Sequence, residues 1–265
     1  MFLIAVSIVF GLIIGSFLNV VIFRLHGGRS LGGRSFCAHC AHTLRWYDLV
    51  PVFSYVALRG RCRYCHSRIS WQYPLVELAV GVTFALIAFP FRHVVLEPLD
   101  FVFLASRFIS FSLFIAIFVY DLRHKIIPDV LVYPLALTAL IPVLVTGFMQ
   151  GFSSETLSAV IAGPILFTPF FLLWFLSRGK WMGFGDAKLA IGMGWLLSIE
   201  GGLSAVIFGF WSGAVVGVAL ISRTRLVHGA NSHVSMKSEV PFAPFLIAGV
   251  YAVEFFHFSI LSLGL

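Results

Sequence analysis

Long apolar runs constrain the fold of this chain more than any other feature of its sequence. A transmembrane helix needs about 20 mostly apolar residues in a row to cross a hydrocarbon layer about 30 Å thick. Such runs occur at residues 2–23, 73–90, 101–120, 126–147, 158–177, 183–199, 203–221 and 241–262. Because lipid offers no hydrogen-bond partners to an open backbone, runs of this length are expected to be helical. The sequence therefore predicts an all-α, polytopic integral membrane protein with about eight transmembrane helices in a lipid bilayer.

The composition agrees with this class and excludes a soluble domain. Hydrophobic residues make up 60% of the 265 residues, and charged residues only 11%. With eight spans, 15 of the 18 Lys and Arg residues fall in loops on one side of the membrane, and Arg92 alone falls in the opposite loops. Cationic loops tend to stay in the cytoplasm, so this side is predicted to be cytoplasmic and both termini to lie outside. Topology thus accounts for the net charge of +7, and no nucleic acid partner is expected.

All four cysteines lie between the first two spans, as Cys37-x-x-Cys40 and Cys62-x-x-Cys65. The 21 residues between the pairs approach the spacing of zinc ribbons, in which each pair gives two thiolates to one tetrahedral metal. A structural Zn²⁺ is expected, because four thiolates leave no open coordination position and cytoplasmic thiols stay reduced. Free thiols, another metal and a redox role are the alternatives. Three nearby histidines are other conceivable ligands but are expected to lie on the surface: His39, His42 and His66.

Four features in and around this insertion predict contacts with the membrane surface or between membrane helices. Residues 45–60 are too apolar for a solvated loop and are expected to lie on the membrane surface, with Trp and Tyr among the headgroups. Gly11 and Gly15 are expected to let another helix approach the first span closely. Asn19 is expected either to bond across helices or to hold a substrate. Glu77, about one turn inside the second span, is either functional or a hydrogen-bonding partner between helices.

Two acidic stretches at predicted cytoplasmic helix ends carry the functional signal. One is Gly183-Phe184-Gly185-Asp186-Ala187-Lys188, in which Gly183 and Gly185 permit a tight turn and the close approach of an extended peptide. Lys188 is expected to pair with an acid or to extend toward the headgroups.

The other acidic stretch runs from Asp121 to Asp129 and joins two spans. Asp121 ends a predicted helix, where the negative end of the helix dipole repels a carboxylate. An acid at this position does not stabilise the helix, so helix stability does not explain why it is there. Asp129 follows Pro128 at a helix start, where both residues favour the helix, and a contact between Asp129 and Asp121 is a further possibility.

These stretches lead to the hypothesis of a catalytic pair formed by Asp121 and Asp186 at the inner membrane boundary. Two carboxylates that share one proton can hydrolyse a peptide bond without a covalent intermediate. The ionised carboxylate takes a proton from water, while the protonated one donates a hydrogen bond to the scissile carbonyl.

Five stretches together form a specific pattern: residues 15–21 (Gly-Ser-Phe-Leu-Asn-Val-Val), the two Cys pairs around residues 58–62 (Leu-Arg-Gly-Arg-Cys), residues 69–77 (Ile-Ser-Trp-Gln-Tyr-Pro-Leu-Val-Glu), residues 121–129, and residues 182–189 (Met-Gly-Phe-Gly-Asp-Ala-Lys-Leu). On these stretches, and over nearly its whole length, the chain resembles the bacterial type IV prepilin peptidases (leader peptidases/N-methyltransferases), membrane aspartic peptidases with a Gly-x-Gly-Asp motif.

The resemblance implies an endopeptidase of the bacterial inner membrane that removes the short basic leader of type IV prepilin or pseudopilin precursors at a glycine, on the cytoplasmic side. It implies catalytic roles for Asp121 and Asp186. It also implies methylation of the new N-terminal amine by S-adenosylmethionine. No nucleotide-binding motif marks the methyl-transfer site, and residues 24–72 are the candidate location for it.

With this resemblance the chain divides into a first transmembrane helix (1–23), a cytoplasmic zinc-binding domain with the four cysteines (24–72) and a transmembrane peptidase domain (73–265). Two other classes of membrane protein share some of these features. A membrane transporter usually has paired broken helices in two corresponding halves, which this sequence lacks. A zinc-ribbon adaptor for a secretion partner would need the cysteines but not the aspartates. No oligomeric state follows from the sequence.

Overall fold

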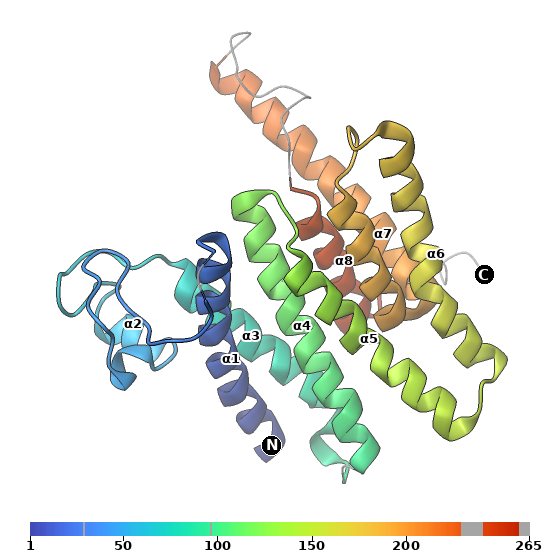
Figure 1. Cartoon of the computed structure of the whole chain (residues 1–265), viewed down its shortest axis with the longest axis horizontal. Helices are drawn as coiled ribbons and strands as arrows, with labels where there is room; N and C mark the ends of the chain where they lie inside the picture. Colours follow the sequence, from blue (N-terminus) through green and yellow to red (C-terminus); the bar gives the residue numbers. More distant parts are fainter. Residues whose placement is uncertain (29, 96, 229–240, 260–265) are drawn as a thin grey trace. The chain divides into compact units, whose positions relative to one another are not determined.

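The computed structural model describes residues 1–28, 30–95, 97–228 and 241–259, and only the backbone of residues 221 and 223–228. Two charged residues of the last predicted cytoplasmic loop, Lys237 and Glu239, lie outside the described residues. The elements are α1 (Phe2–His26), η1 (Trp46–Leu49), α2 (Phe53–Ala57), α3 (Gln72–Ala88), η2 (Phe89–His93), α4 (Pro98–His124), α5 (Asp129–Gln150), α6 (Ser154–Ser177), α7 (Phe184–His228) and α8 (Ala243–Phe256) (Figure 1).

Helices are the main regular structure of the described residues, together with two isolated antiparallel bridges in the insertion between α1 and α3. Among these residues, six helices are long and apolar enough to cross a membrane: Phe2–His26, Gln72–His93, Pro98–His124, Asp129–Gln150, Ser154–Ser177 and Phe184–Leu220. The prediction of an all-α, multi-pass membrane protein with a cysteine-bearing insertion between its first two membrane helices is confirmed.

The difference between eight predicted spans and six long helices has two causes. The runs 183–199 and 203–221 both fall in α7, which is broken rather than ended at Ser198, where φ is 63° and ψ is −176°. Helix α8 has only 14 residues, because the chain leaves the helix at His257 with φ 52°. At 1.5 Å per residue, 14 residues extend about 21 Å, which is short of the hydrocarbon thickness.

The chain divides into two compact units, Met1–Ala116 and Ile117–Leu265, with the boundary inside α4. In the first unit, α1 lies against α3 with almost no space between the backbones. A Cβ at Gly11 would lie 2.8 Å from the Cα of Gly81, and one at Gly15 would lie 2.6 Å from the Cα of Glu77. The amide of Asn19 joins the same helices by donating to the Tyr73 carbonyl at 3.1 Å. The predicted packing roles of these residues are thus confirmed.

In the second unit, small residues again let helices touch. A Cβ at Gly194 of α7 would lie 2.5 Å from the Ala162 carbonyl oxygen of α6, and these two helices lie side by side in Figure 1. One at Gly249 of α8 would lie 2.1 Å from the Ala205 carbonyl oxygen of α7. Because apolar side chains gain little by leaving lipid for one another, close backbone contact of this kind is what holds membrane helices together.

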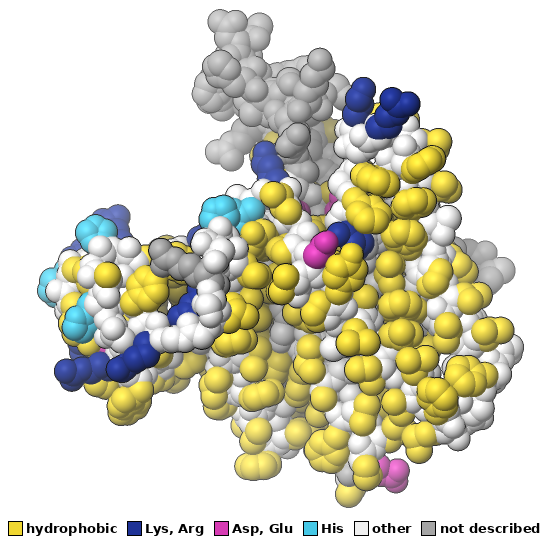
Figure 2. Space-filling model, viewed as in Figure 1, with side chains coloured by type: hydrophobic (Ala, Val, Ile, Leu, Met, Phe, Trp, Pro, Cys, Tyr) yellow, Lys and Arg dark blue, Asp and Glu magenta, His cyan; other side chains and the backbone are white. Residues whose placement is uncertain are grey.

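Helix α5 shows how the outer surface is divided between protein and lipid. Its exposed large side chains recur three or four residues apart and therefore share one face: Val130, Tyr133, Leu137 and Ile141. The residues that it buries lie between them: Leu131, Val132, Leu135 and Ala139. Figure 2 shows hydrophobic side chains over broad areas of the helical surface, as expected where the solvent is lipid.

Candidate active site and metal centre

Asp121 lies in the last turn of α4, and its side chain is buried. The helix ends because Lys125 takes a left-handed conformation with φ 54°, and its N–H donates to the Asp121 carbonyl at 2.8 Å. The residue is only 4% exposed, and its carboxylate accepts a hydrogen bond from the backbone of Ala243, the first residue of α8. The other carboxylate oxygen, Oδ2, is buried and has no hydrogen-bond partner among the described residues. An oxygen of this kind needs a proton, a water molecule or a ligand.

Asp186 lies in the first turn of α7 and is 8% exposed. Its carboxyl group is hydrogen-bonded to the backbone of Gly183, which precedes the helix. It is also close enough to the carboxyl group of Asp121 for the two to interact electrostatically. The structure therefore brings together the two aspartates that the sequence pointed to, both within the second unit.

The two glycines of the Gly-x-Gly-Asp sequence differ in what surrounds them. A Cβ at Gly185 would lie 2.8 Å from the Cβ of Ile127, in the linker between Asp121 and α5. A Cβ at Gly183 would meet nothing closer than an oxygen of Asp186 at 3.6 Å. Neither glycine has positive φ; the left-handed turn before α7 is made at Arg178 and Gly179 instead. Gly185 thus lets the linker that follows Asp121 pack directly against the helix turn that carries Asp186.

Asp129 and Lys188 form an ion pair next to this contact. Asp129 begins α5, and its side chain is 55% exposed, whereas the side chain of Lys188 is only 14% exposed. The Lys188 ammonium also lies 5.0 Å from the centre of the Phe184 ring and 5.5 Å from that of Tyr133. Of the two possibilities expected for Lys188, pairing with an acid is the one observed. The acid is Asp129, so Asp129 joins α5 to α7 at the level of the aspartate pair.

Glu77 lies in the other unit, where it connects the helices to the insertion. It is 6% exposed, and its Oε2 accepts a hydrogen bond from the Val52 backbone N–H at 2.7 Å, while its carboxylate accepts another from the Ser16 side chain. Val52 has φ 61°, a strained value for a β-branched residue. Glu77 therefore holds a strained point of the insertion against α1 and α3, which agrees with the hydrogen-bonding alternative that the sequence left open.

The four cysteines form the metal-ligand cluster that their spacing predicted. The Sγ atoms of Cys37, Cys40, Cys62 and Cys65 all lie within 4.8 Å of one another, and none is in a disulfide. Thiolates placed tetrahedrally at about 2.3 Å from zinc are separated by about 3.8 Å, so these four residues fit the ion.

The two cysteine turns have the same backbone structure. In each, the first cysteine N–H donates to the carbonyl five residues ahead, Cys37 to His42 and Cys62 to Ser67, both at 2.9 Å. The residue after the second cysteine is left-handed in each, with φ 56° at Ala41 and 57° at residue 66. This repeated turn places two thiols on one side. Ala41 and His66 thus both take a left-handed backbone conformation that is usually found at glycine.

Hydrogen bonds in these turns stabilise thiolates. Burial disfavours the Cys37 thiolate, but the N–H groups and thiols around it prevail and lower its pKa to about 6. Hydrogen bonds from the hydroxyl and backbone of Ser67 lower the pKa of Cys65. At Cys40 a backbone hydrogen bond from His42 lowers the pKa, but desolvation and the neighbouring thiols outweigh it and raise the pKa to about 11. Four adjacent thiolates repel one another, and a cation among them would remove that conflict.

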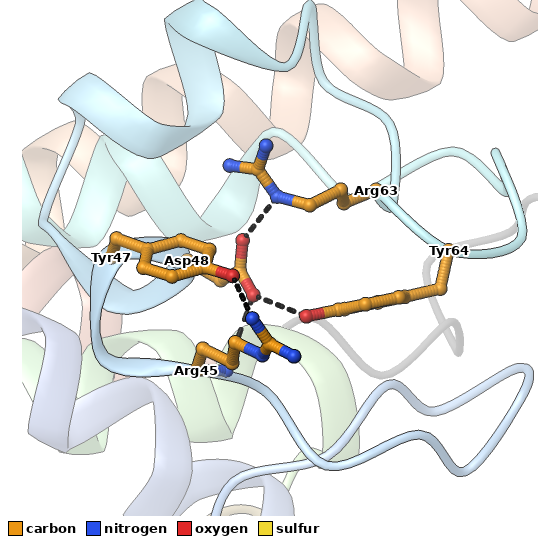
Figure 3. Close-up of polar contacts among 5 residues, drawn as sticks. All are labelled: Arg45, Tyr47, Asp48, Arg63 and Tyr64. Atoms are coloured by element: carbon orange, nitrogen blue, oxygen red, sulfur yellow. Dashed lines mark hydrogen bonds and ion pairs between the residues drawn. The ribbon is translucent and has the colours of Figure 1, made fainter.

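A polar cluster that sequence reasoning missed connects the two cysteine turns (Figure 3). Asp48 of η1 accepts hydrogen bonds from Arg63 Nε at 2.7 Å and from the Tyr64 hydroxyl at 3.1 Å. Burial raises the pKa of Asp48, but these donors and the Arg45 backbone N–H lower it by more. The Tyr64 ring in turn stacks on His42 of the other turn at 3.7 Å. The only sequence signal was that Asp48 is the sole acid in residues 24–72.

The sequence also gives no sign of the role of Arg24, at the end of α1. It is 5% exposed, and its guanidinium donates to five backbone carbonyls, those of residues 30 to 34. These bonds hold the loop that leads to the first cysteine turn against the end of α1.

Comparisons with known proteins agree with the two halves of this description. The model of the bacterial peptidase A24 N-terminal domain matches residues 9–91, which contain the cysteines. The model of the type IV leader peptidase family matches residues 108–218, which contain Asp121 and Asp186. No solved structure matches the chain.

Several curated relatives carry the name prepilin leader peptidase/N-methyltransferase. The one from Burkholderia pseudomallei (strain 1026b) is 34% identical over 281 residues, which cover 95% of this chain and 85% of the relative. The one from Vibrio cholerae serotype O1 is 36% identical over 214 residues, which cover 75% of this chain and 79% of the relative. The one from Stutzerimonas stutzeri is 30% identical over 277 residues, which cover 93% and 89%. Matches of this extent, together with the two family models, show that the chain belongs to the type IV leader peptidase family.

Proposed function

We propose that this protein is an aspartic endopeptidase of the bacterial inner membrane that removes the basic leader from type IV prepilin or pseudopilin precursors. Asp121 and Asp186 are the catalytic residues in this proposal. The observation that carries it is the burial of these two carboxyl groups at helix ends, close enough to interact electrostatically, with one Asp121 oxygen left without a partner among the described residues. Membership of a leader peptidase family supports the same reaction.

The geometry supports a mechanism in which the pair holds a single proton. One carboxylate takes a proton from a water molecule, and the water oxygen attacks the carbonyl carbon of the scissile bond. The other carboxyl group donates a hydrogen bond to the carbonyl oxygen, on which negative charge develops. The amide nitrogen then takes up a proton and leaves as the new N-terminal amine, while the leader keeps the new carboxyl group. The burial of both acids strengthens each of these interactions.

The linker between α4 and α5 sets the distance between the two acids in this proposal. It starts four residues after Asp121, and Ile127 within it packs on Gly185, one residue before Asp186. The Asp129–Lys188 pair fixes the same linker on its other side. Gly185, Asp129 and Lys188 are therefore proposed as positioning residues. Gly183 is proposed to support Asp186 through its backbone hydrogen bond, which does not require a glycine, and Glu77 is proposed to hold the insertion.

We also propose that the protein methylates the new N-terminal amine. The amine would attack the methyl group of S-adenosylmethionine, lose a proton and leave S-adenosylhomocysteine. The names of the relatives support this second activity. Its site is proposed to involve residues 24–72. We propose these residues as a zinc-binding domain, next to a first transmembrane helix (1–23) and a peptidase domain (73–265).

Zinc is proposed as a structural ion, held by Cys37, Cys40, Cys62 and Cys65. Its role would be to hold the two cysteine turns together, since four thiolates close the coordination shell. The positive-inside rule supports a cytoplasmic position for this domain and for the aspartate pair, because eight arginines lie in residues 24–72.

Incubation of the purified protein with a prepilin-like precursor and labelled S-adenosylmethionine, followed by intact mass measurement, tests the proposal. The expected products are a free leader and a shortened chain that is heavier by one methyl group. A shortened chain without the methyl group would remove the transferase activity only. An intact precursor would remove the peptidase assignment and favour an adaptor or a transporter.

A further inference from the structure

The insertion between α1 and α3 exposes large apolar side chains that the cysteine site does not use. The exposed fraction is 79% for Trp46, 73% for Phe53 and 67% for Val56. Phe53 and Val56 share one face of α2, because residues three apart on a helix are neighbours. Leu49, at the end of η1, adds a fourth apolar side chain that is 39% exposed. A soluble domain rarely leaves so many large apolar groups together in water.

Two contacts fix α2 beside the first turns of α3. The N–H of Val52, which precedes α2, bonds to the Glu77 carboxylate at 2.7 Å. The Tyr55 ring of α2 lies 5.3 Å from the Trp71 ring at the start of α3. All of these residues belong to the same compact unit, so the position of α2 along α3 is defined.

That position places α2 beside the first turns of a candidate membrane span. Glu77 lies five residues beyond Gln72, the first residue of that span, which is about 7–8 Å along the helix. An element held against the first turns of a spanning helix is expected near the boundary between headgroups and hydrocarbon. In Figure 1, α2 lies at the edge of the insertion on the side toward the N-terminal end of α1, which is itself a candidate membrane span.

The charges around α2 complete the pattern. Arg45, Arg59 and Arg61 lie on either side of the η1–α2 segment and are exposed. Asp48 is the only acid in residues 24–72, and its side chain is 3% exposed and paired with Arg63. The exposed charge of the insertion is therefore entirely positive. Figure 2 shows Lys or Arg side chains directly beside hydrophobic ones along the lower edge of the insertion.

We propose that η1 and α2 form an interfacial anchor that inserts Trp46, Phe53 and Val56 into the leaflet beside α3, where Arg45, Arg59 and Arg61 bind anionic lipid headgroups. An apolar helix face with arginines at its margin binds such surfaces by area burial and charge together. The anchor holds the cysteine domain flat against the membrane. It does not depend on the peptidase assignment.

Tryptophan fluorescence of the full-length protein in nanodiscs of phosphatidylethanolamine and phosphatidylglycerol tests the anchor. The variant F53W adds a reporter on the apolar face, and H39W adds one on an exposed cysteine turn as the matched control. The emission added by F53W should shift to shorter wavelength, be lost with brominated acyl chains and resist aqueous iodide. The emission added by H39W should show the reverse. Replacing phosphatidylglycerol by phosphatidylcholine, or introducing R59Q with R61Q, should reduce quenching by brominated lipid.

The native Trp46 provides a second measurement should F53W disturb folding, since W46F should then remove emission that brominated lipid quenches. Iodide quenching of F53W without quenching by brominated lipid would overturn the proposal. Shielding of F53W that appears only when a precursor is added would assign the face to substrate instead. Shielding that requires two protein copies per nanodisc would assign it to a second copy of this chain.

Discussion

In the cysteine insertion, each pair of candidate metal ligands lies within a single turn of chain, whereas the two carboxyl groups of the candidate active site come from positions 65 residues apart. Each cysteine turn makes its own backbone hydrogen bonds, so its geometry is local. Asp121 and Asp186 come from different helices, and the linker after α4 and the start of α5 pack against the first turns of α7. The metal site should therefore fail when a ligand is lost, and the aspartate pair should also fail when a packing contact is lost.

Among the variants that test this difference between the two sites, the largest loss of function is expected when a cysteine ligand is replaced. The variant C62S removes a buried ligand, and the purified protein should fall from about one zinc per chain to none. Structural zinc contributes about 10–16 kcal/mol of apparent binding free energy, so the insertion should also become sensitive to limited proteolysis. Metal analysis and proteolysis measure the two effects. H39A, which changes an exposed residue of the same domain, should keep both properties, and zinc retained in full by C62S would contradict the four-thiolate site.

The second-largest effect is expected from a variant that disturbs packing at the aspartate pair but removes no functional group. The variant G185A places a Cβ against Ile127, with an expected cost of about 1–3 kcal/mol in stability. Displacement of the linker by as little as about 1 Å would slow precursor cleavage by about 10²-fold. Rates and thermal midpoints of the purified variants check this.

Gly183 offers the matched control for that variant, since it has room for a Cβ and no positive φ. G183A should therefore cleave at close to the unmodified rate, and I127G, which removes the Cβ that the new side chain would meet, should restore part of the activity of G185A. Equal loss in both glycine variants would show that contact with Ile127 is not what Gly185 provides.

A smaller effect is expected where the insertion joins the helices. E77A leaves the buried Val52 N–H without its acceptor, which should cost about 1–3 kcal/mol of stability. E77Q keeps an oxygen acceptor and should lose clearly less. Thermal unfolding of the two variants measures the difference. Identical losses would mean that the charge of Glu77, and not its hydrogen bond, matters.

The smallest effect should come from the exposed ion pair. Because the Asp129 side chain is 55% exposed, D129N should cost only about 0.2–1 kcal/mol, and the cost should shrink in high salt. Thermal midpoints at low and high ionic strength measure this. A large, salt-independent loss of stability would contradict the description of this ion pair as solvent-exposed.

Much of this arrangement followed from local patterns in the sequence. Apolar run length predicted the membrane helices, and Cys-x-x-Cys spacing predicted the four-thiol cluster, because both depend on neighbouring residues. Glu200-Gly201-Gly202 interrupts the apolar run from 183 to 221, so the sequence predicted two spans there, but the helix continues and is only kinked at Ser198. The end of α8 at Phe256 could not be predicted either, because the apolar run continues past this residue.

The partners of the polar residues could be predicted less well, since they depend on packing. Nothing near Glu77 in sequence indicates Val52, 25 positions away, as its donor. The role of Gly185 also differs from the expected one, because its lack of a side chain serves the Ile127 contact rather than a left-handed turn. The proximity of Asp121 and Asp186 was predicted because both lie at predicted cytoplasmic helix ends and because the family resemblance implies catalytic roles for both. The contacts that bring their helices together, such as Ile127 with Gly185, could be seen only in the structure.

The measurement that tests the central claim most directly is the single-turnover cleavage rate of a prepilin-like precursor by D121N and by D186N, followed by intact mass. Each variant alone should lose about 10²–10⁴-fold or more of the rate, because an amide cannot hold the shared proton, while D129N should keep most of it. Unimpaired cleavage by either D121N or D186N, in a protein with unchanged zinc content and thermal midpoint, would contradict the paired-aspartate mechanism.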